Sequence, residues 1–95
     1  MNSYEVTVIV RNRDAESLKE KVIGILQKFG TQIIKEDHWG TKKLAYEIAG
    51  DSEGYYMFMI ADIPPESIKS IIGEFRLSSD ILRHLFVKIP KAKSA

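Results

Sequence analysis

The sequence contains 95 residues, of which 44% are hydrophobic and 28% charged, and this is the composition of one ordinary globular domain. It contains no cysteine, which excludes a disulfide framework, a cysteine nucleophile and a thiolate metal site. The formal net charge is only +1, but residues 81–95 carry four lysines or arginines and no acid, so a locally basic surface is expected. Residues 1–10 lack the basic flank and the apolar length of a signal peptide or membrane span, which predicts a cytoplasmic protein.

The first part of the chain is predicted to form a strand, a helix and a second strand. Residues 4–11 alternate apolar and polar side chains, the pattern of a half-buried strand. Apolar residues from Leu18 to Phe29 recur at the spacing of one helix face, with Asp14 as the expected N-terminal cap and Gly30 as the left-handed residue after the helix. A second strand is predicted over residues 32–49, with a bulge or bend at Gly40.

The second part of the chain repeats these elements in the order strand, helix, strand. A hairpin loop is predicted at 50–54, a strand at 55–62, a helix after Pro65, and a last strand over 81–89. The order βαββαβ predicts an α+β, ferredoxin-like fold, in which two helices pack on one face of a four-stranded antiparallel sheet. We expect one such domain over residues 1–90, followed by a short basic tail at 91–95.

The two faces of this sheet are expected to differ in what they contact. The face toward the helices is predicted to carry Tyr4, Val6, Val8, Val10, Leu44, Tyr46, Ile48, Tyr56, Phe58, Ile60, Leu85 and Val87. The opposite face would then expose apolar side chains on a scale that marks an interaction surface. The residues predicted to meet a protein partner there are Ile9, Tyr55, Met57, Met59 and Phe86. The alternatives are that a loop or the tail covers this face, or that a strand has a different register.

No catalytic or metal-binding constellation is visible, so we expect neither an enzyme nor a cofactor. His38 and His84 lie on different predicted strands without acids at triad or ligand spacing, and the glycines do not form a phosphate loop. Acylphosphatases have this size and topology, and Arg11 and Arg13 imitate their loop arginine. The asparagine that those enzymes need on a central strand is missing, because the chain has only Asn2 and Asn12. A regulatory domain that binds a small ligand stays open as an alternative.

The sequence shares features with two RNA-binding families of this topology. The stretch Glu53 to Phe58 is faintly similar to the third strand of the RNA recognition motif, but it has an acid where a base is wanted, and the first strand lacks the stacking aromatic. A closer resemblance lies in Gly40-Thr41-Lys42-Lys43-Leu44-Ala45-Tyr46-Glu47-Ile48-Ala49, which resembles the signature of the bacterial small-subunit ribosomal protein family number six. Trp39 before it, Gly54-Tyr55-Tyr56 after it and Leu82-Arg83-His84-Leu85 also look like that family.

The chain departs from this family at three places. Glu47 stands where the family often has proline, and Asn12-Arg13 stands where it has a proline in the loop. His84 follows Arg83 where the family can carry a second arginine, which weakens the expectation of a phosphate contact there, since a neutral imidazole supplies little charge.

The resemblance implies a structural, non-enzymatic protein of the small ribosomal subunit, with no small-molecule substrate and no membrane contact. It implies binding to the central domain of small-subunit ribosomal RNA together with the small-subunit protein number eighteen. The residues expected to contact phosphate are Lys42, Lys43, Arg83, Lys88, Lys91 and Lys93, and Trp39 is expected to stack on a base. Tyr46 is assigned either to the core or to a base, with the core favoured. The alternative function is a protein-interaction or small-ligand module of the same fold without RNA.

Overall fold

The computed structural model describes residues 2–48 and 50–90, and its elements follow the expected order. The strands are β1 (Asn2–Arg11), β2 (Gln32–Ile48), β3 (Asp51–Ile63) and β4 (Ile81–Lys88). The helices are α1 (Ala15–Lys28) and α2 (Ile68–Leu77), and the 3-10 turn η1 (Pro65–Ser67) leads into α2. The expected tail at 91–95 lies outside the described residues, so the division of the chain into a domain and a tail stays a prediction.

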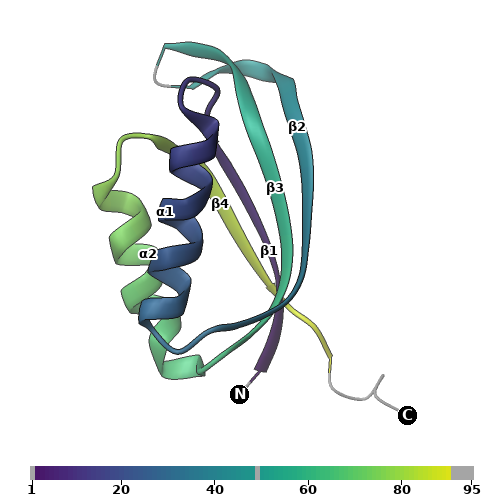
Figure 1. Cartoon of the computed structure of the whole chain (residues 1–95), viewed down its shortest axis with the longest axis vertical. Helices are drawn as coiled ribbons and strands as arrows, with labels where there is room; N and C mark the ends of the chain where they lie inside the picture. Colours follow the sequence, from purple (N-terminus) through teal and green to yellow (C-terminus); the bar gives the residue numbers. More distant parts are fainter. Residues whose placement is uncertain (1, 49, 91–95) are drawn as a thin grey trace.

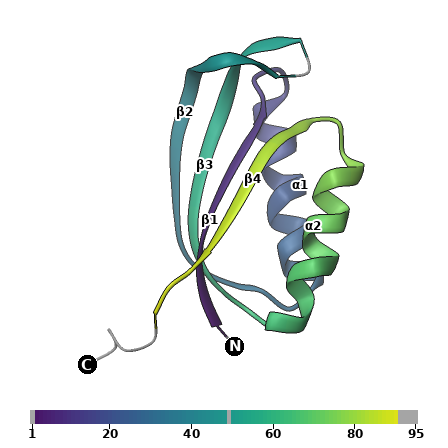
Figure 2. The same cartoon turned by 180° about the vertical axis from the view of Figure 1, so that it is seen from behind.

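The four strands form one antiparallel sheet in the order β2-β3-β1-β4. Both helices lie on the same side of this sheet, and no helix of residues 2–48 and 50–90 lies on the other side (Figures 1 and 2). The α+β, ferredoxin-like prediction is therefore confirmed. β1 and β3 occupy the centre of the sheet, whereas β2 and β4 are its edges.

Two glycines with positive φ angles lie where the sequence predicts them, one at the end of α1 and one at a bulge in β2. Gly30 has a φ of 80° and donates its backbone N–H to the Gln27 carbonyl, which closes the last turn of α1. Gly40 has a φ of 84°, and the pairing of β2 with β3 shifts register between His38 and Gly40, so a bulge is present. At the start of α1, Asp14 occupies the cap position with a φ of 58°, but its side chain makes no capping hydrogen bond. The expected side-chain cap is therefore absent.

The core lies between the sheet and the two helices. Val6, Val8 and Val10 of β1 are fully buried, and so are Met57 and Met59 of β3. The helices contribute the buried side chains Leu18, Val22, Leu26, Ile71 and Phe75. On β1 the predicted core face is thus correct.

On β3 and β4, the assignment of residues to faces is wrong. β1 pairs Val6 with Met59 and Val8 with Met57, and paired residues point to the same side of a sheet. Met57 and Met59 are therefore core residues, and Tyr55 and Phe86 pack against the same core. Of the five residues predicted to meet a partner, only Ile9 lies on the helix-free face. The residues expected in the core but found on that face are Tyr56, Phe58, Ile60, Leu85 and Val87.

The end of the β2–β3 hairpin contacts the helix-free face. A Cβ built on Gly54 would lie 2.5 Å from the Cγ2 of Ile9 and 3.5 Å from the Cδ2 of Leu44. Leu44 is buried, as expected, but beside Ile9 rather than in the core between sheet and helices. The end of the hairpin therefore covers part of this face at Ile9. This is close to the alternative, left open by the sequence, that a loop covers the face.

Candidate nucleic-acid and protein interfaces

Three of the predicted RNA-contacting cations lie at the hairpin end of the sheet. Lys42 and Lys43 are exposed on β2, opposite Gly54 and Glu53 of β3. Because successive strand residues point to opposite faces, the two ammonium groups leave the strand on opposite sides. Arg83 pairs with Ile9 near the start of β4, and its guanidinium lies 5.2 Å from the centre of the Tyr46 ring of β2. The aromatic contact therefore connects Arg83 to the strand that carries the two lysines.

Tyr46 is not a core residue, contrary to the interpretation that the sequence favoured. Its side chain is 58% exposed and faces Arg83. A guanidinium over an aromatic ring is an attractive cation–π contact, worth about 0.5–1 kcal/mol at an exposed site. Tyr46 thus holds Arg83 in place while both side chains keep part of their surface open to solvent.

The remaining predicted cations are not part of this cluster. Lys88 pairs with Tyr4 at the other end of β4, five residues from Arg83, which corresponds to about 17 Å of strand. Lys91 and Lys93 lie outside the described residues. The structure thus brings Lys42, Lys43 and Arg83 to one end of the sheet and leaves Lys88 at the other.

Trp39 lies on the helix-free face and stacks on Phe58. The two ring centres are 5.5 Å apart and the planes are inclined by only 6°. Phe58 covers one side of the indole, yet 47% of the Trp39 side chain stays exposed. The indole therefore offers a rigid aromatic surface that is already held in position by a neighbouring strand.

Apolar side chains continue across the helix-free face from β3 to β4. Leu85 is 59% exposed and Val87 is 45% exposed, and both lie on the same side of the sheet as Phe58. An exposed apolar surface with aromatic members is characteristic of protein interaction sites. The sequence pattern does not identify these residues, because β3 is apolar on both of its faces and only its register against β1 distinguishes the two faces.

His84 packs toward the core and adds no charge to these surfaces. The ring of His84 contacts the rings of Phe75 and Phe86, whose centres are 5.7 and 6.1 Å away, on the side toward the helices. Burial lowers the pKa of His84 below its ordinary value of 6.5, and the positive charge of Arg76 lowers it further. His84 is therefore mainly neutral at pH 7 and supplies no cation for a phosphate.

Among residues 2–48 and 50–90 there is no group of three or more histidine or acidic side chains placed to hold a metal ion. Neither helix in this part of the chain has the length and apolar run that a membrane span needs.

The fold and its exposed surfaces define a small ferredoxin-like protein with a cationic hairpin end and an apolar, helix-free sheet face.

Comparison with known proteins identifies the family. Residues 3–88 match the model of the family described as ribosomal protein S6. The small ribosomal subunit protein bS6 of Dehalococcoides mccartyi is 34% identical over 96 residues, which cover 94% of this chain and 85% of the relative. The chain therefore belongs to the ribosomal protein S6 family. It is a structural, non-enzymatic component of the small subunit of the cytoplasmic ribosome, where it binds ribosomal RNA.

Solved structures agree on the fold. The crystal structure of 30S ribosomal protein S6 from Thermotoga maritima aligns with a TM-score of 0.83 at 24% identity, covering 93% of this chain and 87% of the other. The C-terminal domain of the MgtC protein from Mycobacterium tuberculosis aligns with a TM-score of 0.62 at 12% identity, covering 100% and 95%. These likenesses show that the fold alone does not specify the function.

Proposed function

We propose that the chain binds the central domain of small-subunit ribosomal RNA together with the small-subunit protein number eighteen. The observation that supports binding to both an RNA and a protein is that the chain has two different exposed surfaces. Cations gather at the hairpin end, and apolar side chains occupy the helix-free face next to it. A near-neutral protein gains little from RNA alone, so a partner that covers the apolar face and adds positive charge strengthens the complex.

The RNA surface in this proposal begins at Lys42, Lys43 and Arg83. Phosphate contacts of this kind fix the position and orientation of the protein, while the shape of the RNA supplies selectivity. Lys88, Lys91 and Lys93 would contact phosphates at the far end of β4. Trp39 would stack on an unpaired base through the indole side that Phe58 leaves open, a contact worth about 1–3 kcal/mol.

The partner surface in this proposal is the helix-free face rather than the set expected from the sequence. Met57 and Met59 are fully buried toward the helices, and Tyr55 and Phe86 pack against the same core, so these four are left out of the proposed surface. Ile9 is retained, because it lies on the helix-free face and the hairpin covers it only in part. Phe58, Leu85 and Val87 replace the four as apolar contacts. Their exposure in the isolated chain leaves apolar area that a partner can bury.

The test of the RNA surface is the salt dependence of binding to a transcript of the central domain, measured with the protein number eighteen present. Lys42→Ala combined with Lys43→Ala is expected to weaken binding and to reduce the slope of log K against log salt by about one to two. The matched control is Lys21→Ala with Lys69→Ala, which removes two exposed lysines from the helices. An unchanged slope in the first variant would exclude the two strand lysines from the RNA surface.

A further inference from the structure

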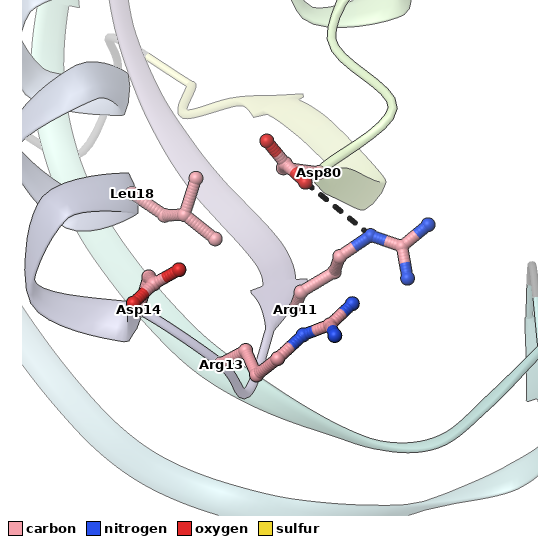
Figure 3. A pocket seen from close by; sticks show the side chains of 5 residues that line it. All are labelled: Arg11, Arg13, Asp14, Leu18 and Asp80. Atoms are coloured by element: carbon pink, nitrogen blue, oxygen red, sulfur yellow. Dashed lines mark ion pairs between the residues drawn. The ribbon is translucent and has the colours of Figure 1, made fainter.

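A polar hollow lies beside the hairpin end, and the functions assigned so far do not use it. Its volume is about 200 Å³, and it is lined by Arg11, Arg13, Asp14, Leu18 and Asp80 (Figure 3). These residues come from the end of β1, the turn into α1, the first turns of α1 and the segment before β4. The hollow is therefore formed where the connection from β1 to α1 meets the segment before β4.

Arg11 has a fixed position at this hollow. Its backbone N–H donates to the Asp80 carbonyl at 2.9 Å, and its Nε lies 3.3 Å from the Asp80 Oδ1. Only 19% of the Arg11 side chain is exposed. Backbone and side chain together hold the guanidinium in one orientation, so a ligand there would lose little of its affinity to ordering the arginine.

Arg13 places a second guanidinium at the same hollow. Arg13 is exposed in the short turn between β1 and α1, and Figure 3 shows its guanidinium on the same side of the turn as that of Arg11. The carboxylate of Asp14 is directed away from both, toward Leu18 (Figure 3). A guanidinium presents paired N–H groups that an oxyanion accepts, so a phosphate oxygen beside the exposed Arg13 would be bound in a defined orientation.

The hollow is connected to the strand that carries the predicted RNA contacts. Asn12, between the two arginines, accepts a hydrogen bond through its Oδ1 from the Thr41 hydroxyl of β2. Thr41 directly precedes Lys42 and Lys43. This bond holds the turn against the hairpin, so one polyanion that contacts the lysines passes close to the arginines.

We propose that Arg11 and Arg13 hold a backbone phosphate of the same RNA that contacts Lys42 and Lys43. This inference rests on the proposed RNA-binding function and adds two arginines to its contact surface. Two arginines and two aspartates line the hollow, so their formal charges cancel and a free, doubly charged phosphate gains little there. A singly charged phosphodiester, already brought near by the neighbouring lysines, has a high effective concentration at the arginines.

The experiment measures binding of the same central-domain transcript by the full chain with the protein number eighteen. Arg13→Gln is expected to lower affinity several-fold and to reduce the salt slope by about one, because one phosphate contact is lost. Arg13→Lys should restore the slope but only part of the affinity, since an ammonium lacks the two-pronged geometry. Lys69→Gln, which removes one exposed charge from α2, is the control and should bind like the unaltered chain.

The outcomes separate this inference from the proposed function. Normal binding by Arg13→Gln, with weakened binding by the Lys42 and Lys43 variant, would overturn the inference and leave the function standing. Loss of binding in Lys69→Gln equal to that in Arg13→Gln would also overturn it, because the effect would then be one of total charge. No binding by the unaltered chain would reject both.

A spectroscopic measurement tests the source of the phosphate. The side-chain Nε–H resonance of Arg13 is followed by NMR during addition of the transcript and, separately, of inorganic phosphate. A shift with the transcript and none with inorganic phosphate at matched ionic strength is expected. Saturable binding of inorganic phosphate alone would overturn the assignment to RNA.

Discussion

Gly54 provides space for a side chain of the neighbouring strand. A Cβ at this position would lie 2.5 Å from the Ile9 Cγ2, closer than two carbon atoms normally approach. The same Cβ would also lie 3.4 Å from the backbone carbonyl oxygen of Val10 and 3.5 Å from the Cδ2 of Leu44, so it would be enclosed on several sides. Gly54 therefore lets the hairpin approach β1 closely, and its role is one of space rather than of backbone conformation.

Gly54→Ala is expected to lower the free energy of unfolding by about 1–3 kcal/mol, the usual cost of overpacking. Urea denaturation with the midpoint and slope fitted separately measures this change. Gly24→Ala is the matched control: Gly24 is exposed in α1, a Cβ there meets nothing within 4 Å, and the change should stabilise the chain by up to about 1 kcal/mol. Equal stability of the Gly54 variant and the unaltered chain would contradict this account.

His84 should make the stability depend on pH. Burial, assisted by Arg76, lowers its pKa in the folded chain below 6.5, so the unfolded chain binds a proton more readily. Above about pH 6.5, His84 is neutral in both states and the folded chain keeps its full stability. As the pH falls below that value, the unfolded chain takes up the proton first, so the free energy of unfolding decreases. Comparing urea denaturation at about pH 7.5 and about pH 5 for the unaltered chain and His84→Gln isolates the effect. A pH dependence that is the same in both would assign it to other groups.

At the level of the elements, the order and type of helices and strands could be predicted because each has a clear local signal. β1 alternates valines with Glu5 and Thr7, and this alternation identifies its core face without knowledge of the neighbours. β3 is apolar at Tyr56 and Phe58 as well as at Met57 and Met59, so no local signal selects a face. The pairing of Met57 with Val8 selects it, and that pairing is a long-range property.

The hairpin end of β2 shows the same limitation for the candidate site. The sequence pattern indicated that Lys42 and Lys43 lie on one strand, and this is confirmed. It did not indicate that Tyr46 leaves the core to contact Arg83, since that contact depends on how the hairpin bends toward β4. In the sequence, Arg11 and Arg13 stand out only because they resemble the loop arginine of acylphosphatases. Their place beside Lys42 follows from the hydrogen bond between Asn12 and Thr41.

At the level of the whole molecule, the helix layer and the open sheet face have different relations to solvent and partners. The helices complete the core from one side, so the residues of β3 and β4 that point away from them depend on another molecule for burial. The cationic hairpin end adjoins this open face through Arg83 and Tyr46. In the proposed function, a protein partner on the face and an RNA at the hairpin end would be bound together, and each would contribute free energy to a common complex.

The partner surface is tested by Leu85→Glu, assayed by calorimetric titration with the small-subunit protein number eighteen. Leu85 is 59% exposed, so the charge should leave the fold intact, yet on association it would be buried against apolar side chains. We expect affinity to fall at least tenfold, or about 1.4 kcal/mol. Leu77→Glu is the matched control, because Leu77 is 84% exposed on α2 and lies away from the open face. Unchanged affinity in Leu85→Glu, or an equal loss in both variants, would place the partner elsewhere on the molecule.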